Sequence, residues 1–145
     1  MTLQLTATTR ADANDLAELR LLAMRDSLEA VGRFEPSRAR QRFLASFNPA
    51  NTRKLLIDHR LAAFLVVLDK GDHFYLDHLY VHPDFQAQQL GSRLLEFVKA
   101  QARSAGKAIR LGALTGSRAN HFYLAHGFIE THREAFDNYY QWLPN

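Results

Sequence analysis

The sequence predicts an α/β (α+β) fold, with a central mixed, mostly antiparallel sheet flanked by helices. Three observations support this fold class. The expected elements follow the order β, α, α, β, β, β, α, β, α, β, β. Only the strands at 74–82 and 109–114 are joined by a helical crossover, so they alone can form a parallel pair. The 145 residues have the length of one domain, which we expect to span 1–145.

Composition is that of an ordinary globular protein and excludes some chemistry. The chain has no cysteine, which rules out disulfides, thiolate metal sites and a cysteine nucleophile. The longest apolar run, 61–68, is too short to cross a membrane, and the N-terminus lacks a signal-peptide core. We therefore expect a cytoplasmic protein. A net charge of +3 suits an anionic ligand but predicts no nucleic-acid partner.

The first half of the chain predicts two helices between strands. Thr9 and Asp12 form a possible capping box at the first helix. The strand at 61–68 is apolar on both faces, so we expect it to be central and covered on each side. The expected elements are a strand at 3–7, a helix at 11–31, a helix at 35–47, and strands at 54–58 and 61–68.

The second half begins with a strand that Pro83 should end, because proline cannot donate to a sheet ladder. A helix follows through Ala105, and Ser117 is a possible cap for a short helix ending at Ala125. A hairpin closes the chain, with its last strand at 138–143. The inward stripe of the long helix has a helical period and consists of Leu90, Leu94, Leu95, Val98 and Ala102.

The strand, turn and helix of residues 74–105 are a known way to build an anion site. The first turn of a helix offers unpaired N–H groups and the positive end of the helix dipole. Gly91 lets the backbone approach a bound group closely.

Two motifs of this chain resemble the GNAT superfamily of acyl-CoA N-acyltransferases. The first is Val81-His82-Pro83 followed by the turn at 86–91, which matches Gln/Arg-x-x-Gly-x-Gly/Ala except that Gln89 replaces the first glycine. The second runs from Asn120 through Tyr123 to Gly127-Phe128. The order and length of the elements are also similar, so the resemblance covers nearly the whole chain.

The resemblance implies acetyl-CoA as the acyl-donor cosubstrate, bound beside the parallel strand pair, and no metal. Seven histidines show no metal-binding spacing. The residues that would bind the cosubstrate are Leu79, Tyr80, Val81, Gln86, Ala87, Gln88, Gln89, Leu90, Gly91, Ser92, Asn120, Phe122 and Tyr123. Whether Gln89 crowds the phosphates or stabilises the turn stays open.

Three residues are candidates for catalysis. The resemblance implies that Tyr123 protonates the leaving thiolate; the alternative is a tyrosine that packs the short helix. Asp77 and His78 lie in the middle of a strand, where burying an unpaired polar group would be costly. Strand alternation sends the two side chains to opposite faces. Asp77 would organise removal of the amine proton, and His78 or His121 could be the base. The alternatives are a structural carboxylate and a packed core histidine.

The implied function is N-acetyltransfer from acetyl-CoA to a primary amine, on a small molecule or a protein, by direct transfer in a ternary complex. The rival hypothesis is a non-catalytic acyl-CoA sensor or interaction domain, which the substitution at Gln89 motivates. A homodimer is possible. The arginines at 33, 38, 40 and 42 could meet an anionic group of either substrate, or could be a solvated face.

Overall fold

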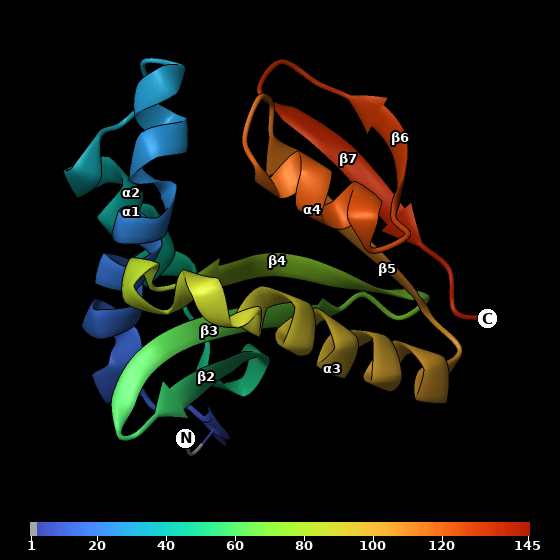
Figure 1. Cartoon of the computed structure of the whole chain (residues 1–145), viewed down its shortest axis with the longest axis horizontal. Coiled ribbons are helices and arrows are strands. Elements are labelled where there is room, and N and C mark those ends of the chain that lie inside the picture. Colours follow the sequence, from blue (N-terminus) through green and yellow to red (C-terminus); the bar gives the residue numbers. More distant parts are fainter. Residues whose placement is uncertain (1–2) are drawn as a thin grey trace. The chain divides into compact units, whose positions relative to one another are not determined.

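The computed structural model describes residues 3–145 and contains a seven-stranded mixed sheet with four α-helices (Figure 1). The strand order is β1-β2-β3-β4-β5-β7-β6. β4 and β5 are parallel, with His73–Tyr75 opposite Ala108–Arg110, which confirms the predicted pair. The strands are β1 (Leu3–Ala7), β2 (Thr52–Ile57), β3 (Arg60–Asp69), β4 (His73–Val81), β5 (Ala108–Leu114), β6 (Ile129–Arg133) and β7 (Asp137–Trp142).

The helices lie close to their predicted positions. The short helix is the exception at its start: it begins at Ala119 after Arg118, so Ser117 does not cap it, although the Asn120 N–H donates to the Ser117 carbonyl. The α-helices are α1 (Ala13–Ala30), α2 (Pro36–Ser46), α3 (Leu90–Ala105) and α4 (Ala119–Ala125). The 3₁₀ segments are η1 (Arg10–Asp12), η2 (Pro49–Asn51) and η3 (Pro83–Gln88).

The chain forms two compact units, which are described separately. The first comprises 3–66 and 78–91, and the second 67–77 and 92–145. In the described residues 3–145, no helix is long and apolar enough to cross a membrane.

The first unit is built around β3. Ala62, Ala63 and Phe64 have no exposed surface, so the strand predicted to be central is buried on both faces. β1 and β3 both pair with β2 in antiparallel fashion. Phe43 of α2 packs edge-on against Phe64, with ring centroids 5.5 Å apart. Leu16 of α1 is also fully buried, as its helical period predicts.

The entry to α1 is tied to β2 by polar side chains. The Thr9 N–H donates to Asp12 Oδ2 at 2.8 Å, which is the predicted bond of the capping box, although it closes η1 rather than α1 itself. Lys54 Nζ donates to the other Asp12 oxygen at 2.8 Å. The buried Thr8 hydroxyl donates to the Thr52 carbonyl at 3.1 Å.

The second unit packs α3 and α4 against its strands. Leu95, Val98 and Ala102 have no exposed surface, so the predicted stripe of α3 is a core stripe. Gly106 ends the helix at a φ of 67°, which glycine adopts without strain. The closing hairpin is present, since β7 pairs antiparallel with both β5 and β6. Figure 1 shows α4 beside this hairpin.

Asp12→Asn should weaken the fold in a pH-dependent way. Burial alone would raise the pKa of the Asp12 carboxyl, but the hydrogen bonds from Lys54 and Thr9 lower it overall. Because the pKa is lower in the folded state, its contribution is present above the unfolded pKa of about 3.9 and is lost as pH falls through the folded value. We expect a loss of about 0.5–1 kcal/mol near neutral pH.

Urea denaturation at neutral and strongly acidic pH measures this loss. Asp26→Asn, at an exposed position of α1, is the matched control and should change little. A loss for Asp12→Asn that does not shrink as the pH falls into the acidic range would contradict the assignment, because protonation of the carboxyl removes its contribution.

Candidate functional site

β4 ends in a hydrogen-bonded turn that leads toward α3. The His82 N–H donates to the Ala62 carbonyl at 2.7 Å, and its Nδ1 accepts from the Asp84 N–H at 3.1 Å. Pro83 occupies the first position of η3, where its fixed φ is suited and its missing N–H costs nothing. The predicted polar turn is therefore a 3₁₀ segment whose start is held to β3.

Gln89 joins η3 to α3 in the left-handed conformation, with φ 56° and ψ 31°. A residue with a Cβ enters this region at a cost of about 1–2 kcal/mol, whereas glycine enters freely. This gives a physical reason for a glycine at this position in the motif. The glutamine side chain is exposed, and the turn keeps the conformation that glycine would adopt.

Side chains of the first unit hold this turn in place. Phe85 is buried, and the Arg60 guanidinium lies 4.8 Å from the centre of its ring. Arg60 also pairs with Asp84 at 3.2 Å, and Gln86 Nε2 donates to the Val81 carbonyl at 3.3 Å. The proposed phosphate-binding stretch is thus an ordered turn at the start of α3, with the Gln88 and Gln89 side chains exposed.

His78 lies in an aromatic cluster of the first unit. Its ring contacts Phe43 and Tyr80 with centroids 5.5 Å apart in each case, and Phe64 at 6.3 Å. His78 Nδ1 lies 3.3 Å from the Tyr80 hydroxyl. The alternative of a packed histidine therefore agrees with this arrangement. Leu79 and Val81 are half-buried. The catalytic role of His78 stays a prediction.

Asp77 is exposed and belongs to the second unit. Its negative charge contributes to the raised pKa of Tyr75, two residues earlier, so the two side chains are close enough to interact. His78, by contrast, shares its side of the strand with Tyr80. The two side chains therefore lie on opposite faces of the strand, as expected from strand alternation. Asp77 is the more accessible of these two candidate catalytic residues.

The Asn120 carboxamide is fully engaged within the second unit. Its Nδ2 donates to the Leu114 carbonyl at 2.9 Å and to the Ser117 carbonyl at 3.0 Å. Its Oδ1 accepts from Asn138 Nδ2 at 2.9 Å and from the Tyr140 hydroxyl at 2.7 Å. These bonds join α4 to β5 and β7, a structural role that the sequence did not indicate. A contact with acetyl-CoA stays a prediction for this residue.

Tyr123 is buried among aromatic rings of the second unit. Its ring lies 5.1 Å from Phe122, 5.4 Å from Phe128 and 6.4 Å from Tyr140, measured between centroids. Gly127 turns the chain at a φ of 86°, which brings the Phe128 N–H to the Tyr123 carbonyl at 3.0 Å. The Gly-Phe part of the motif thus ends α4 and packs against the tyrosine.

A polar link between α3 and the end of α4 was not predicted. Ser92 Oγ lies 3.0 Å from His126 Nε2, and the buried Lys99 donates to the His126 carbonyl at 2.6 Å. Sequence patterns could not find this link, because 34 residues separate Ser92 from His126 and no local period connects them. It holds the helix that carries Tyr123 to the helix that begins at the predicted phosphate site.

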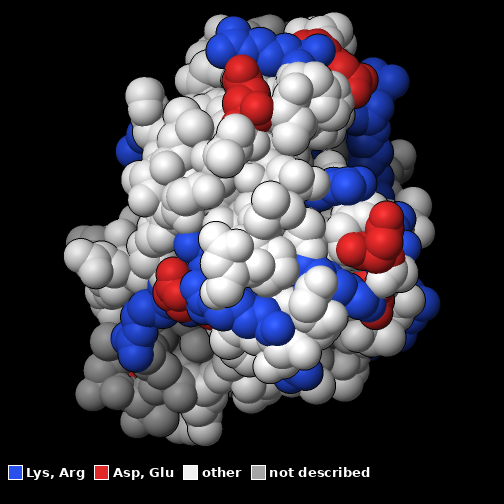
Figure 2. All heavy atoms as spheres, turned by 90° about the vertical axis from the view of Figure 1, so that its right-hand side faces the viewer, with Lys and Arg blue, Asp and Glu red and all other residues white. Residues whose placement is uncertain are grey.

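The remaining surfaces offer no further candidate catalytic group. In the arginine group, Arg38 pairs with Glu35 and Arg40 with Glu18, which favours a solvated face. Figure 2 shows Lys and Arg interspersed with Asp and Glu on the face it displays.

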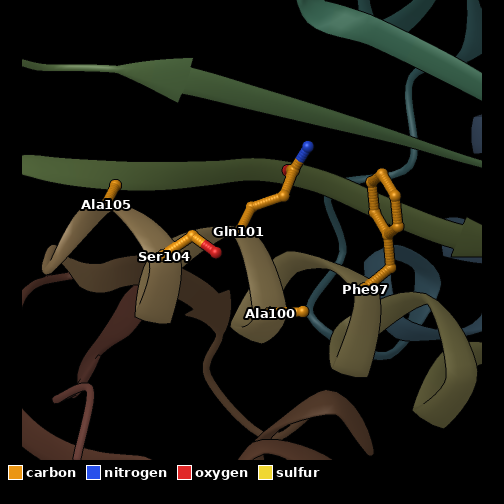
Figure 3. A pocket seen from close by; sticks show the side chains of 5 residues that line it. All are labelled: Phe97, Ala100, Gln101, Ser104 and Ala105. Carbon is orange, nitrogen blue, oxygen red and sulfur yellow. The ribbon is translucent and has the colours of Figure 1, made fainter.

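An open pocket follows one side of α3 (Figure 3), and its lining has no titratable group: Phe97, Ala100, Gln101, Ser104 and Ala105. Among the described residues, histidines and carboxylates form no group of three that could hold a metal ion.

Similarity to known families agrees with the motifs. A family model described as an acetyltransferase (GNAT) domain matches residues 52–130, which include Asp77, the turn at 86–92 and Tyr123. A stretch of 51 residues, 35% of this chain, is 49% identical to part of an amino-acid acetyltransferase from Shewanella oneidensis. That stretch covers only 11% of the relative.

Solved structures share the fold at low sequence identity. The PaiA N-acetyltransferase of Thermoplasma acidophilum, in complex with coenzyme A, aligns with a TM-score of 0.82 at 14% identity, over 99% of each chain. The ribosomal-protein-S18-alanine N-acetyltransferase of Escherichia coli aligns with a TM-score of 0.70 at 18% identity, over 97% of this chain and 91% of that one. These similarities support the fold that the sequence predicts.

Gln89→Gly should stabilise the turn at the start of α3. Glycine removes the strain of a left-handed residue with a Cβ but adds entropy to the unfolded chain, so we expect a net gain of up to about 1 kcal/mol. Gln89→Val should lower the free energy of unfolding by at least the same amount, because a β-branched residue is poorly tolerated at positive φ. Thermal unfolding measures both changes.

The neighbouring Gln88 provides the control, because it is not among the residues with positive φ. Gln88→Gly should destabilise the protein, since it adds entropy and relieves no strain. Equal effects of glycine at the two positions would show that the left-handed turn is not the source of the gain.

Proposed function

Because the chain belongs to the GNAT acetyltransferase family, we propose that it transfers an acetyl group from acetyl-CoA to a primary amine. The observation that carries this proposal is the family match over 52–130, which contains the predicted turn and the tyrosine motif. Transfer is direct, in a ternary complex, since the chain has no cysteine to hold the acyl group. The acceptor is an amine of a small molecule or of a protein.

The cosubstrate pyrophosphate binds at the turn between β4 and α3. Two features of the first unit support this assignment: the left-handed Gln89, and the start of α3 directly after it at Leu90. The first-turn N–H groups of a helix lack partners within the helix and attract anions. Exposed Gln86, Gln88 and Gln89 border this turn and supply further donors.

The transfer step requires one proton to leave and another to arrive. The neutral amine attacks the thioester carbonyl carbon, the C–N bond forms and the C–S bond breaks. A primary amine of pKa about 10 is about 0.1% neutral at pH 7, so its proton must be removed. Asp77, which is exposed on β4, orients the ammonium or removes its proton through a water. A carboxylate is too weak a base to take the proton of an alkylammonium directly.

Tyr123 supplies the proton to the departing thiolate. A phenol and a thiol have similar basicity, so this transfer is nearly balanced. The packing of the Tyr123 ring against Phe128 and Tyr140 supports the role, because it restricts the ring to a narrow range of orientations. His78 is the alternative base.

The rival function is a non-catalytic acyl-CoA sensor. This hypothesis rests on the glutamine that replaces the first glycine of the motif. Gln89 adopts the backbone conformation that glycine would supply, which weakens that motive. Acetylation of any amine by the purified protein separates the two functions.

Gly91→Glu should abolish acetyl-CoA binding. The carboxylate would put a negative charge and extra bulk in the first turn of α3, where the pyrophosphate is proposed to bind. Ser104→Glu adds the same charge at an exposed position near the other end of α3 and is the control. Isothermal titration calorimetry measures both, and unchanged affinity in Gly91→Glu with intact secondary structure would refute the assignment of this turn.

Tyr123→Phe should slow the reaction without loosening the cosubstrate. The variant keeps the ring and its packing and removes only the hydroxyl, so kcat should fall about 10²-fold. The dissociation constant of acetyl-CoA should stay within a few-fold. Steady-state kinetics on an accepted amine measure the change, and a kcat equal to that of the wild type would remove Tyr123 from the mechanism.

A further inference from the structure

A row of rings crosses one face of the strands of the second unit. The ring of Tyr139 on β7 stacks on that of His132 on β6, with centroids 4.6 Å apart and planes 5° from parallel. On the other side, Tyr139 and the Tyr75 hydroxyl both approach Gly112 of β5. Residues from four neighbouring strands therefore contribute to one surface.

Gly112 is what allows these rings to lie close to the sheet. A Cβ at this position would lie 2.9 Å from Tyr139 Cε1 and 3.4 Å from the Tyr75 hydroxyl. Gly112 is not among the glycines with positive φ, so the backbone does not require glycine here. The reason for glycine is the room that it leaves above the strand.

This face lies opposite the packed core of the unit. Gly112 pairs with Tyr139, whereas the adjacent pairs, Leu111 with Tyr140 and Ala113 with Asn138, point to the other side and are buried. Tyr139 is half-buried and Gly112 is exposed. The ring row is therefore an accessible surface of the sheet rather than part of its core.

Carboxylates lie along the side of the row that faces the turn between β6 and β7. Glu134 lies 3.3 Å from His132 Nε2, and the Glu134 N–H donates to the Asp137 carbonyl in the hairpin turn. Asp77 follows Tyr75 by two residues on the same side of β4. Arg110 is a cation on this face; it lies opposite Gln141, further from the hairpin turn, and donates to its Oε1 at 2.9 Å.

The tyrosines of the row are neutral hydrogen-bonding groups at physiological pH. Burial raises the pKa of Tyr75 to about 12, and the neighbouring acidic groups of Tyr139, Asp77 and Asp137 add to the shift. Burial also raises the pKa of Tyr139, with Glu134 and Asp137 adding to it. The same carboxylates that disfavour a phenolate favour a bound cation, and aromatic faces attract organic ammonium groups.

We propose that this surface selects the acceptor, and that the acceptor is an amine whose chain carries a second positive charge. The ring row, formed by Tyr75, Tyr139 and His132 above Gly112, contacts the chain of the acceptor. Asp77 receives the reactive ammonium, and Asp137 and Glu134 receive the second charge. The inference rests on the proposed function, since it names the substrate class of the same reaction.

The charge distribution also predicts which class of amine this surface prefers. A dication is attracted to the side of the row with Asp77, Asp137 and Glu134 and repelled from the side with Arg110. A monoamine gains only part of this attraction, and an amine with a distant carboxylate meets repulsion from the acidic side. The preference among these three classes is therefore a direct measure of the surface.

Three acceptors with a five-carbon chain test the proposal: cadaverine, pentylamine and aminovalerate, with a positive, a neutral and a negative far end. We expect kcat/KM for cadaverine to exceed that for pentylamine by about tenfold, with aminovalerate the poorest. Asp137→Asn with Glu134→Gln, and separately Tyr139→Leu, should each reduce the ratio of cadaverine to pentylamine about fivefold. Acetyl-CoA affinity should stay within a few-fold in each variant.

Glu130→Gln is the matched control, because Glu130 pairs with Arg133 and lies opposite Tyr140 on the other side of the hairpin. It should leave the ratio unchanged. Equal kcat/KM for cadaverine and pentylamine in the wild type would overturn the inference, as would a ratio that none of the variants changes.

A direct binding measurement separates this inference from the proposed function. Cadaverine should shift the ring-proton NMR signals of His132 and Tyr139 in the wild type and not in the Asp137→Asn, Glu134→Gln double variant. Shifts without any acetylation would keep the surface and refute the acetyltransferase. Acetylation of an amine without these shifts would support the acetyltransferase and refute the surface. A concentration-dependent dimer in which Tyr139→Leu breaks the contact would show that a second copy of the chain covers the face instead, which also overturns the inference.

Discussion

The left-handed residue at Gln89 is the constraint on which the start of α3 depends. The chain leaves η3, turns through one residue at φ 56°, and enters a helix whose stripe is fully buried from its first residue, Leu90. If this turn had another conformation, the helical period would put a different face of α3 inward. The first N–H groups of α3, which lack partners within the helix, follow this turn directly. Core packing and the proposed anion site therefore rest on one backbone conformation.

Asn120 performs a comparable task in the second unit. Its carboxamide accepts and donates four hydrogen bonds that join α4 to the ends of β5 and β7. A half-buried amide with all these bonds formed favours one arrangement of the elements, because a displacement breaks several hydrogen bonds at once. The link of Ser92 and Lys99 to His126 restrains the same helix from the side of α3. Tyr123 is thus carried by a helix that is restrained at both ends.

Much of the fold could be predicted because its determinants are local. The period of Leu94, Val98 and Ala102 identified the core face of α3, and the apolar run at 61–68 identified the central strand. The helical crossover required the parallel pair of β4 and β5. The start of α4 was missed by one residue, because Ser117 is a good cap by type but Arg118 occupies the cap position. Boundaries of short helices depend on the turn that precedes them.

The sequence by itself determined the element order, the core faces and the family motifs, which follow from residue type and spacing along one segment. The resemblance that these motifs carry then gave Asp77 and Tyr123 as candidates. Only the tertiary structure decided that Gln89 is left-handed, that His78 packs among rings, and that Asn120 is consumed by internal bonds. It also placed Tyr75, Gly112 and Tyr139 on one surface. The contacts of His78, Asn120 and Gly112 join residues that are far apart in the chain. A local sequence pattern cannot show which distant side chain will bond a given polar group or fill the space above a glycine.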